Sequence, residues 1–90
     1  MEIDFDNNKR NRTLNERGLD FARAGEVFSG KHFTAEDIRK DYGETRYITA
    51  GKLDGRVVVL VWTPRGNVRR IISMRKANER ESTRFKKHLE

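Results

Sequence analysis

The sequence has no cysteine, a single proline and no long apolar run. The lack of cysteine excludes disulfide bonds, thiolate nucleophiles and thiolate metal ligands. The longest uninterrupted apolar stretch, residues 57–62, is far shorter than the ~18 residues of a membrane span. Residues 1–4 are acidic and lack the apolar core of a secretory signal peptide. These absences predict a cytoplasmic protein with no membrane partner.

Hydrophobic residues are scarce as well. They make up 34% of the 90 residues, whereas charged residues make up 38%. Typical domains are ~45–50% apolar and ~25% charged. A chain this short also buries only about 60–65% of the surface that its unfolded form exposes. We therefore expect one domain over residues 1–90 with a thin core, formed by a single sheet covered by helices.

The positive charge lies in the second half of the chain. Residues 1–55 carry 10 basic and 11 acidic side chains, a balance of −1, and residues 56–90 carry 10 basic and 3 acidic, a balance of +7. The whole net charge of +6 therefore comes from the last 35 residues. This asymmetry favours a polyanion or an acidic protein as partner. A solvated basic surface without a partner is the alternative.

Capping signals predict three helices. Asp6 is a good N-cap for a helix that ends near Arg17, with Gly18 at the left-handed position that follows it. Asp20 starts a second helix, which ends at Gly30. The last helix starts at Asn78, where Glu81 three residues later completes a variant of the capping box.

The strands are predicted between the second and the third helix. Residues 56–63 are apolar on both faces, as in a central strand. Turn signals at residues 53–55 and 64–67 join this segment to its neighbours. The expected strands are 44–52, 56–63 and 68–75, with a shorter one at 32–34, a loop at 35–43 and a strand or extended arm around residues 3–5. The fold class is α+β, with two N-terminal helices, an antiparallel sheet of three to four strands and a C-terminal helix.

Most conventional sites are excluded by the motifs that are missing. His32 and His88 have no metal-ligand spacing around them and belong to no Ser-His-Asp pattern. The acidic residues 36, 37 and 41 do not form a calcium loop, and no glycine-rich phosphate loop is present. We therefore expect neither a metal nor an organic cofactor.

A basic strand remains as the candidate site. Residues 65–76 contain five basic side chains and no acid: Arg65, Arg69, Arg70, Arg75 and Lys76. Strand alternation predicts one face with Val68, Arg70, Ile72 and Met74, and another with Arg69, Ile71, Ser73 and Arg75. An arginine held between apolar neighbours presents its donors bidentately to phosphate oxygens. Arg70 could instead pair with a carboxylate such as Glu44 on a neighbouring strand.

RNA cleavage is compatible with this composition because it does not require a metal. The ribose 2′-hydroxyl attacks the adjacent phosphate when a base takes its proton, an acid protonates the leaving oxygen and cations stabilise the phosphorane. Glu44 is the candidate base, and Tyr47 or Lys76 could donate the proton. Tyr47 and Trp62 could stack on unpaired bases, although packing is the favoured interpretation for Trp62.

Several motifs in a shared order give the chain a resemblance to a known family. They are Phe5-Asp6-x-x-Lys9, Gly18-Leu19-x-Phe21 with Val27-Phe28, Tyr42-Gly43-Glu44-x-Arg46-Tyr47 with Gly51, the strand 57–63, and Arg70-Ile71-Ile72-Ser73-Met74-Arg75-Lys76-Ala77. Together they resemble the BrnT-type toxins of bacterial type II toxin–antitoxin systems, over nearly the full length. The resemblance implies a RelE-like fold and a ribonuclease that cleaves RNA and inhibits translation and growth. It also implies a BrnA-type ribbon-helix-helix antitoxin, a heterotetramer with it, and binding of operator DNA only through the antitoxin.

The same resemblance suggests the site residues. It implies an RNA-facing set of Arg46, Arg70, Ser73, Arg75 and Lys76, to which the basic strand adds Arg69. We expect Arg70 and Arg75 to hold the scissile phosphate, and Glu44 and Tyr47 to transfer protons.

Two positions depart from the family pattern. Phe5 stands where tryptophan is frequent, and Glu16-Arg17 stands where Lys-His is common. Because the Arg17 guanidinium is a poor base near neutral pH, an inactive homologue that serves as antitoxin partner and co-repressor stays open as an alternative to a nuclease. The charge distribution alone leaves open another alternative, a general RNA-binding module.

Overall fold

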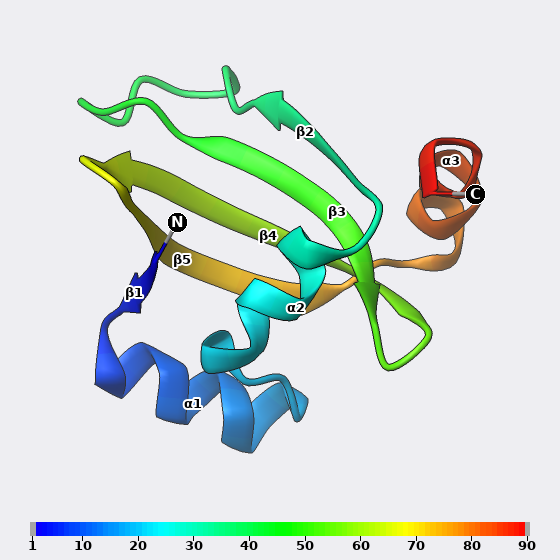
Figure 1. Cartoon of the computed structure of the whole chain (residues 1–90), viewed down its shortest axis with the longest axis horizontal. Helices are drawn as coiled ribbons and strands as arrows, with labels where there is room; N and C mark the ends of the chain where they lie inside the picture. The colour runs from blue at the N-terminus through cyan, green and yellow to red at the C-terminus, as the bar shows by residue number, and fades with distance from the viewer. Residues whose placement is uncertain (1, 90) are drawn as a thin grey trace.

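The computed structural model describes residues 2–89, in which three α-helices surround a five-stranded sheet (Figure 1). The elements are β1 (Glu2–Phe5), α1 (Asn7–Arg17), the 3₁₀ turn η1 (Phe21–Arg23), α2 (Ala24–Ser29), β2 (His32–Glu36), β3 (Tyr47–Leu53), β4 (Arg56–Arg65), β5 (Val68–Lys76) and α3 (Glu79–Leu89). The strand order is β1-β5-β4-β3-β2. The α+β class is therefore confirmed.

The predicted antiparallel sheet of three to four strands is wrong in two respects. The sheet has five strands among the described residues, and β1 pairs with β5 in parallel, with Asp4 beside Arg70. Parallel neighbours are joined by a long crossover and not by a tight turn. The sequence around Ile3 and Phe5 therefore holds no local signal for this pairing.

Of the two predicted N-terminal helices, the first is present as expected and the second is divided. Asp6 Oδ1 accepts a hydrogen bond from the Lys9 amide at 3.0 Å, and Gly18 has φ of 69°, so both predicted ends of α1 are confirmed. The second predicted helix is divided into η1 and the short α2. Its first turn closes with i to i+3 bonds, such as Arg23 N to Asp20 O at 3.0 Å, which is the tighter 3₁₀ pattern.

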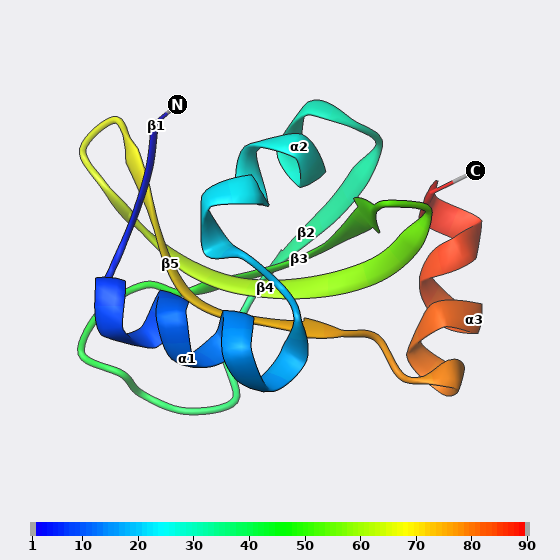
Figure 2. The same ribbon diagram turned by 90° about the horizontal axis from the view of Figure 1, so that it is seen from below.

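The core lies between the sheet and the segment η1–α2. Figure 2 shows α2 on one side of the sheet, the loop 37–46 on the opposite side, and α3 at one end. On the α2 side, fully buried side chains from both layers pack together: Phe21, Ala24, Val27, Val58, Leu60, Ile71 and Met74. We call this side the helix side. The opposite side, which includes Ile48, Val59, Val61 and Thr63, we call the open face. The loop 37–46 and α3 cover it in part, so Val59 and Thr63 are each only 3% exposed.

A β-bulge in β5 decides which arginines reach the open face. Trp62 pairs with Ile71, but Val61 pairs with Ser73, so Ile72 is an extra residue without a partner. A bulge of this kind shifts the alternation by one residue. Arg70, Ser73 and Arg75 consequently lie opposite Thr63, Val61 and Val59, which share the open face. The predicted alternation is therefore wrong beyond residue 71, and Ile71 and Met74 are both buried on the helix side.

Gly51 allows α2 to approach the sheet closely. A Cβ atom at Gly51 would lie 2.6 Å from Val27 Cγ1 and 3.3 Å from His32 Cβ. Val27 is completely buried, so it cannot move aside into solvent. We expect Gly51→Ala to lower the free energy of unfolding by about 1–3 kcal/mol, measured by urea denaturation. Gly25→Ala is the matched control, because a Cβ there meets no atom within 4 Å; equal stability of the two variants would contradict the prediction.

Candidate functional site

Two of the cavities that β5 residues line contain the predicted arginines Arg70 and Arg75. The first, the Arg70 cavity, has a volume of about 230 Å³ and is lined by Asp6, Lys9, Glu44, Arg46, Arg65, Arg70, Ile71 and Ile72. The second, the Arg75 cavity, has a volume of about 280 Å³ and is lined by Arg39, Ile48, Val59, Val61, Ser73, Arg75, Glu81, Arg84 and Phe85. Basic side chains outnumber acidic ones in both linings, so both cavities favour anions.

In the Arg70 cavity, a carboxylate on the neighbouring strand β1 holds the Arg70 side chain. Arg70 NH1 donates to Asp4 Oδ2 at 2.7 Å, and this hydrogen bond lowers the pKa of Asp4. The carboxylate that Arg70 contacts is thus Asp4 and not Glu44. Glu44 instead accepts from Arg46 Nε at 3.1 Å and lies 3.9 Å from Arg65 NH2.

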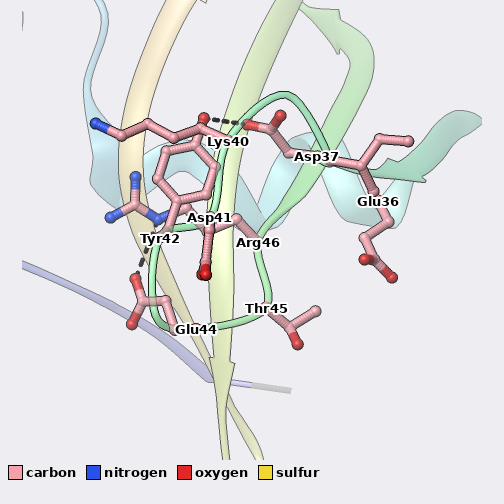
Figure 3. A pocket seen from close by; sticks show the side chains of 9 residues that line it. Glu36, Asp37, Lys40, Asp41, Tyr42, Glu44, Thr45 and Arg46 are labelled. Atoms are coloured by element: carbon pink, nitrogen blue, oxygen red, sulfur yellow. Dashed lines mark hydrogen bonds and ion pairs between the residues drawn. The ribbon is translucent and has the colours of Figure 1, made fainter.

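The loop 37–46 brings side chains to both cavities. Asp37 is buried and accepts from Arg39 Nε and NH2, both at 2.8 Å, and from the Tyr42 hydroxyl at 3.1 Å. The bond from Arg39 is the main reason that the pKa of Asp37 is well below its usual range. The Arg46 guanidinium stacks on the Tyr42 ring at 4.1 Å (Figure 3). These contacts hold the loop in a defined shape.

The position of this loop corrects one predicted boundary. The strand expected at residues 44–52 begins only at Tyr47, so Glu44 and Arg46 belong to the loop. Thr63 Oγ1 on β4 donates to the Thr45 carbonyl at 2.7 Å and attaches the loop to the sheet. The buried Asp37 carboxylate accepts hydrogen bonds from donors within the loop. These local hydrogen bonds compete with strand pairing in this segment.

The Arg75 cavity contains a bidentate ion pair. Arg75 NH1 and NH2 donate to the two carboxylate oxygens of Glu81 at 2.6 and 2.8 Å. Glu81 also accepts from the Asn78 amide at 3.0 Å, while its own amide donates to Asn78 Oδ1 at 2.8 Å, which confirms the predicted capping box. The Arg75 bond is the main cause that lowers the pKa of Glu81 to about 2.

Three of the predicted site residues lie away from the open face. Tyr47 is on the helix side, with its ring 4.9 Å from that of Trp62. Arg69 is on the same side, 3.9 Å over the Phe28 ring and 5.2 Å over the Trp62 ring. Lys76, at the end of β5, pairs with Val58 and lines a separate cavity. The structure therefore groups Glu44 and Arg46 with Arg70, and Ser73 with Arg75, but leaves Tyr47, Arg69 and Lys76 elsewhere.

Trp62 has a packing role on the helix side. It is only 7% exposed, and its Nε1 donates to Thr49 Oγ1 at 2.8 Å. The favoured interpretation of Trp62 as a packing residue is confirmed.

A comparison with protein families decides the identity of the chain. The model described as "Ribonuclease toxin, BrnT, of type II toxin-antitoxin system" matches residues 5–81.

The chain belongs to the BrnT family. The resemblance inferred from the motifs is confirmed, and this protein is a ribonuclease toxin of a type II toxin–antitoxin system, with an antitoxin as partner. Its family match runs from the last residue of β1 through β5 to the start of α3. It includes the whole lining of the Arg70 cavity and all of the Arg75 cavity except Arg84 and Phe85. None of the curated proteins searched matches the chain. Within residues 2–89 no helix is long and apolar enough to cross a membrane.

Arg17, in the last turn of α1, supports the edge of the sheet. Beside α1, β5 continues past the end of β1, so the backbone of residues 72–76 has no strand partner on that edge. Arg17 NH1 donates to the Met74 carbonyl there at 3.0 Å. Arg17 therefore satisfies an edge acceptor that would otherwise depend on water.

The structure also brings residues into the BrnT cavities that the sequence did not suggest. Arg39 comes from the loop, Arg84 from α3, and Lys9 from α1. Glu81 was expected only as a helix cap, and its contact with Arg75 was not anticipated. One available signal was the spacing of Glu81, Arg84 and Phe85, which places them on one face of a helix.

Proposed function

We propose that this toxin is a metal-independent endoribonuclease that binds a single RNA strand along β5 on the open face. The observation that carries the proposal is the bulge at Ile72, which puts Arg70, Ser73 and Arg75 on the same face. Without it, the two arginines would lie on opposite sides of the sheet. The excess of positive charge in residues 56–90 supports a polyanionic substrate.

The arginines bind and stabilise phosphates in this proposal. Arg70 and Arg75 are five residues apart on one strand, roughly 15 Å at the usual rise per residue. They therefore bind different phosphates of one strand, with Ser73 between them. Guanidinium donors form paired hydrogen bonds with phosphate oxygens and stabilise the additional charge of a phosphorane. Arg46 and Arg65 add positive charge at the Arg70 end, and Arg39 and Arg84 at the Arg75 end.

The two residues expected to transfer protons, Glu44 and Tyr47, differ in their position relative to the cavities. Glu44 lies in the Arg70 cavity and stays a candidate base for a phosphate bound there. Tyr47 lies on the helix side, with the sheet between it and both cavities. We therefore keep Glu44 and leave Tyr47 out of the proposed reaction.

Growth inhibition and its control follow from the same surface. We propose that RNA cleavage stops translation and growth, and that a BrnA-type antitoxin neutralises the toxin in a heterotetramer. An acidic antitoxin segment laid over the open face would block the arginines from RNA. Operator DNA would then be bound by the ribbon-helix-helix part of the antitoxin and not by the toxin.

The proposal is tested with purified protein and an end-labelled single-stranded RNA in buffer with EDTA. We expect cleavage with 2′,3′-cyclic phosphate and 5′-hydroxyl product ends, because the 2′-hydroxyl is the nucleophile. A 2′-O-methyl RNA of the same sequence is the control and should stay intact. Activity only after addition of Mg²⁺ would contradict the metal-free reaction. RNA that is bound with steep salt dependence but not cut, even with translating ribosomes, would favour a binding module or an inactive co-repressor.

A further inference from the structure

We propose that Glu81 is the general base of RNA cleavage, and that the scissile phosphate binds to Arg75 next to it. This inference rests on the proposed ribonuclease function and names Glu81, in place of Glu44, as the residue that accepts the 2′-hydroxyl proton. The geometry behind it is the bidentate pair of Arg75 and Glu81, with oxygen–nitrogen distances of 2.6 and 2.8 Å, inside a cavity of about 280 Å³.

Arg75 can hold Glu81 and a phosphate at the same time. A guanidinium has five N–H donors, and Glu81 occupies one edge of it, formed by NH1 and NH2. The Nε edge makes no hydrogen bond within residues 2–89, so it is free for a second, paired contact with phosphate oxygens. A carboxylate and a phosphate on two edges of one guanidinium are close enough for the carboxylate to reach the neighbouring 2′-hydroxyl.

The surroundings of the pair keep Glu81 in the ionised form, which can accept a proton. The Glu81 side chain is 21% exposed and packs in a cavity that also has apolar walls from Val59, Val61 and Phe85. Its pKa of about 2 in the free protein keeps it ionised at physiological pH. A dianionic phosphorane bound to Arg75 is a like charge beside the carboxylate, which raises the pKa of Glu81 and makes it more basic.

Further cations are available for the transition state. Arg39 and Arg84 line the same cavity, and Glu81 is its single carboxylate. The Glu44 carboxylate lies in the other cavity and is flanked by Arg46. The Arg75 cavity therefore combines a carboxylate with three guanidinium groups, which together can accept a proton and stabilise the phosphorane.

The reaction balances without a metal or another reagent. The 2′-hydroxyl proton moves to a Glu81 oxygen while the 2′-oxygen forms a bond to phosphorus. The bond between phosphorus and the 5′-oxygen breaks, and that oxygen takes a proton from water. Glu81 then returns its proton to the solvent, and the products are a 2′,3′-cyclic phosphate and a 5′-hydroxyl end.

The test compares Glu81→Gln with two matched variants in the EDTA cleavage assay. Glutamine keeps the capping-box acceptor for the Asn78 amide, so α3 should stay folded, which circular dichroism and Tm report. Loss of a general base lowers kcat by about 10²–10⁴-fold. KM should stay the same or fall, because a negative charge beside the phosphate is removed. A 2′-O-methyl RNA should bind to this variant at least as tightly as to the unchanged protein.

The controls separate this inference from its alternatives. Glu79→Gln removes the same charge from the same helical turn but leaves both cavities intact, so its kcat should not change. If Glu81→Gln keeps its kcat while Glu44→Gln loses it, the base lies in the Arg70 cavity and the inference is wrong. A purely structural role for Glu81 would lower Tm and raise KM with kcat preserved, which also overturns it. Absence of cleavage by the unchanged protein would instead reject the proposed function itself.

Discussion

Arg70→Ala should abolish growth arrest and lower the kcat/KM of RNA cleavage by about 10–100-fold, the loss expected when a charge-assisted hydrogen bond of about 1.5–3 kcal/mol to a substrate phosphate is removed. Arg70 lies on the open face opposite Thr63 and is oriented by Asp4 at 2.7 Å. Its guanidinium lines the same cavity as Glu44 and Arg46. Both activities should fall together, because in the proposed function growth arrest results from RNA cleavage.

The same substitution should leave the fold intact. The Arg70 and Asp4 side chains are 27% and 50% exposed, and a pair of this kind contributes only about 0–1 kcal/mol. Arg56→Ala is the matched control, since it removes an exposed arginine that lines neither cavity. The measurements are growth after induction without the antitoxin, RNA cleavage and Tm. Full toxicity of Arg70→Ala at equal protein level would remove Arg70 from the site.

The largest loss of stability is expected from Phe21→Ala. Phe21 is 1% exposed, lies at the start of the segment that covers the helix side, and makes an edge-on contact with Phe5 at 6.1 Å. Truncating a buried phenylalanine costs about 3–5 kcal/mol, a large share of the 5–15 kcal/mol that typically stabilises a domain. In a chain with so few apolar residues, we expect a mostly unfolded variant at 37 °C.

Urea denaturation followed by the fluorescence of Trp62 would measure this effect. Phe33→Ala is the control, because Phe33 is 37% exposed on the edge strand β2 and should cost about 1 kcal/mol by the smaller apolar area it buries. Phe21→Ala should lose toxicity through unfolding, whereas Arg70→Ala should lose it while folded. Similar losses for the two phenylalanine variants would show that the core on the helix side is not the main source of stability.

Local signals explain why much of the fold was predictable. The ends of α1 depend on Asp6 and Gly18, and the start of α3 depends on Asn78 and Glu81, each within one turn of the backbone it caps. The strands β4 and β5 were expected within two residues of their observed ends, because a tight turn joins them. The family, too, was evident from motifs distributed along the chain.

The geometry of the candidate site was less predictable, because it depends on pairings between distant segments. Glu44 was assigned to a strand because its neighbours favour one, but the buried Asp37 organises the loop around itself and delays β3 until Tyr47. Asp4 and Arg70 are 66 residues apart in sequence, and only the parallel pairing of β1 and β5 brings them together.

The sequence by itself determined the α+β class, most element boundaries, the basic strand and the BrnT resemblance, since each depends on neighbouring residues or on a motif. Only the tertiary structure decided which basic side chains share a surface. One extra residue, Ile72, reverses the alternation of β5 and places Arg70 with Ser73 and Arg75. A bulge forms where the pairing of two strands and the packing of the core on one of their faces require it. The residue composition of a single strand does not specify either condition.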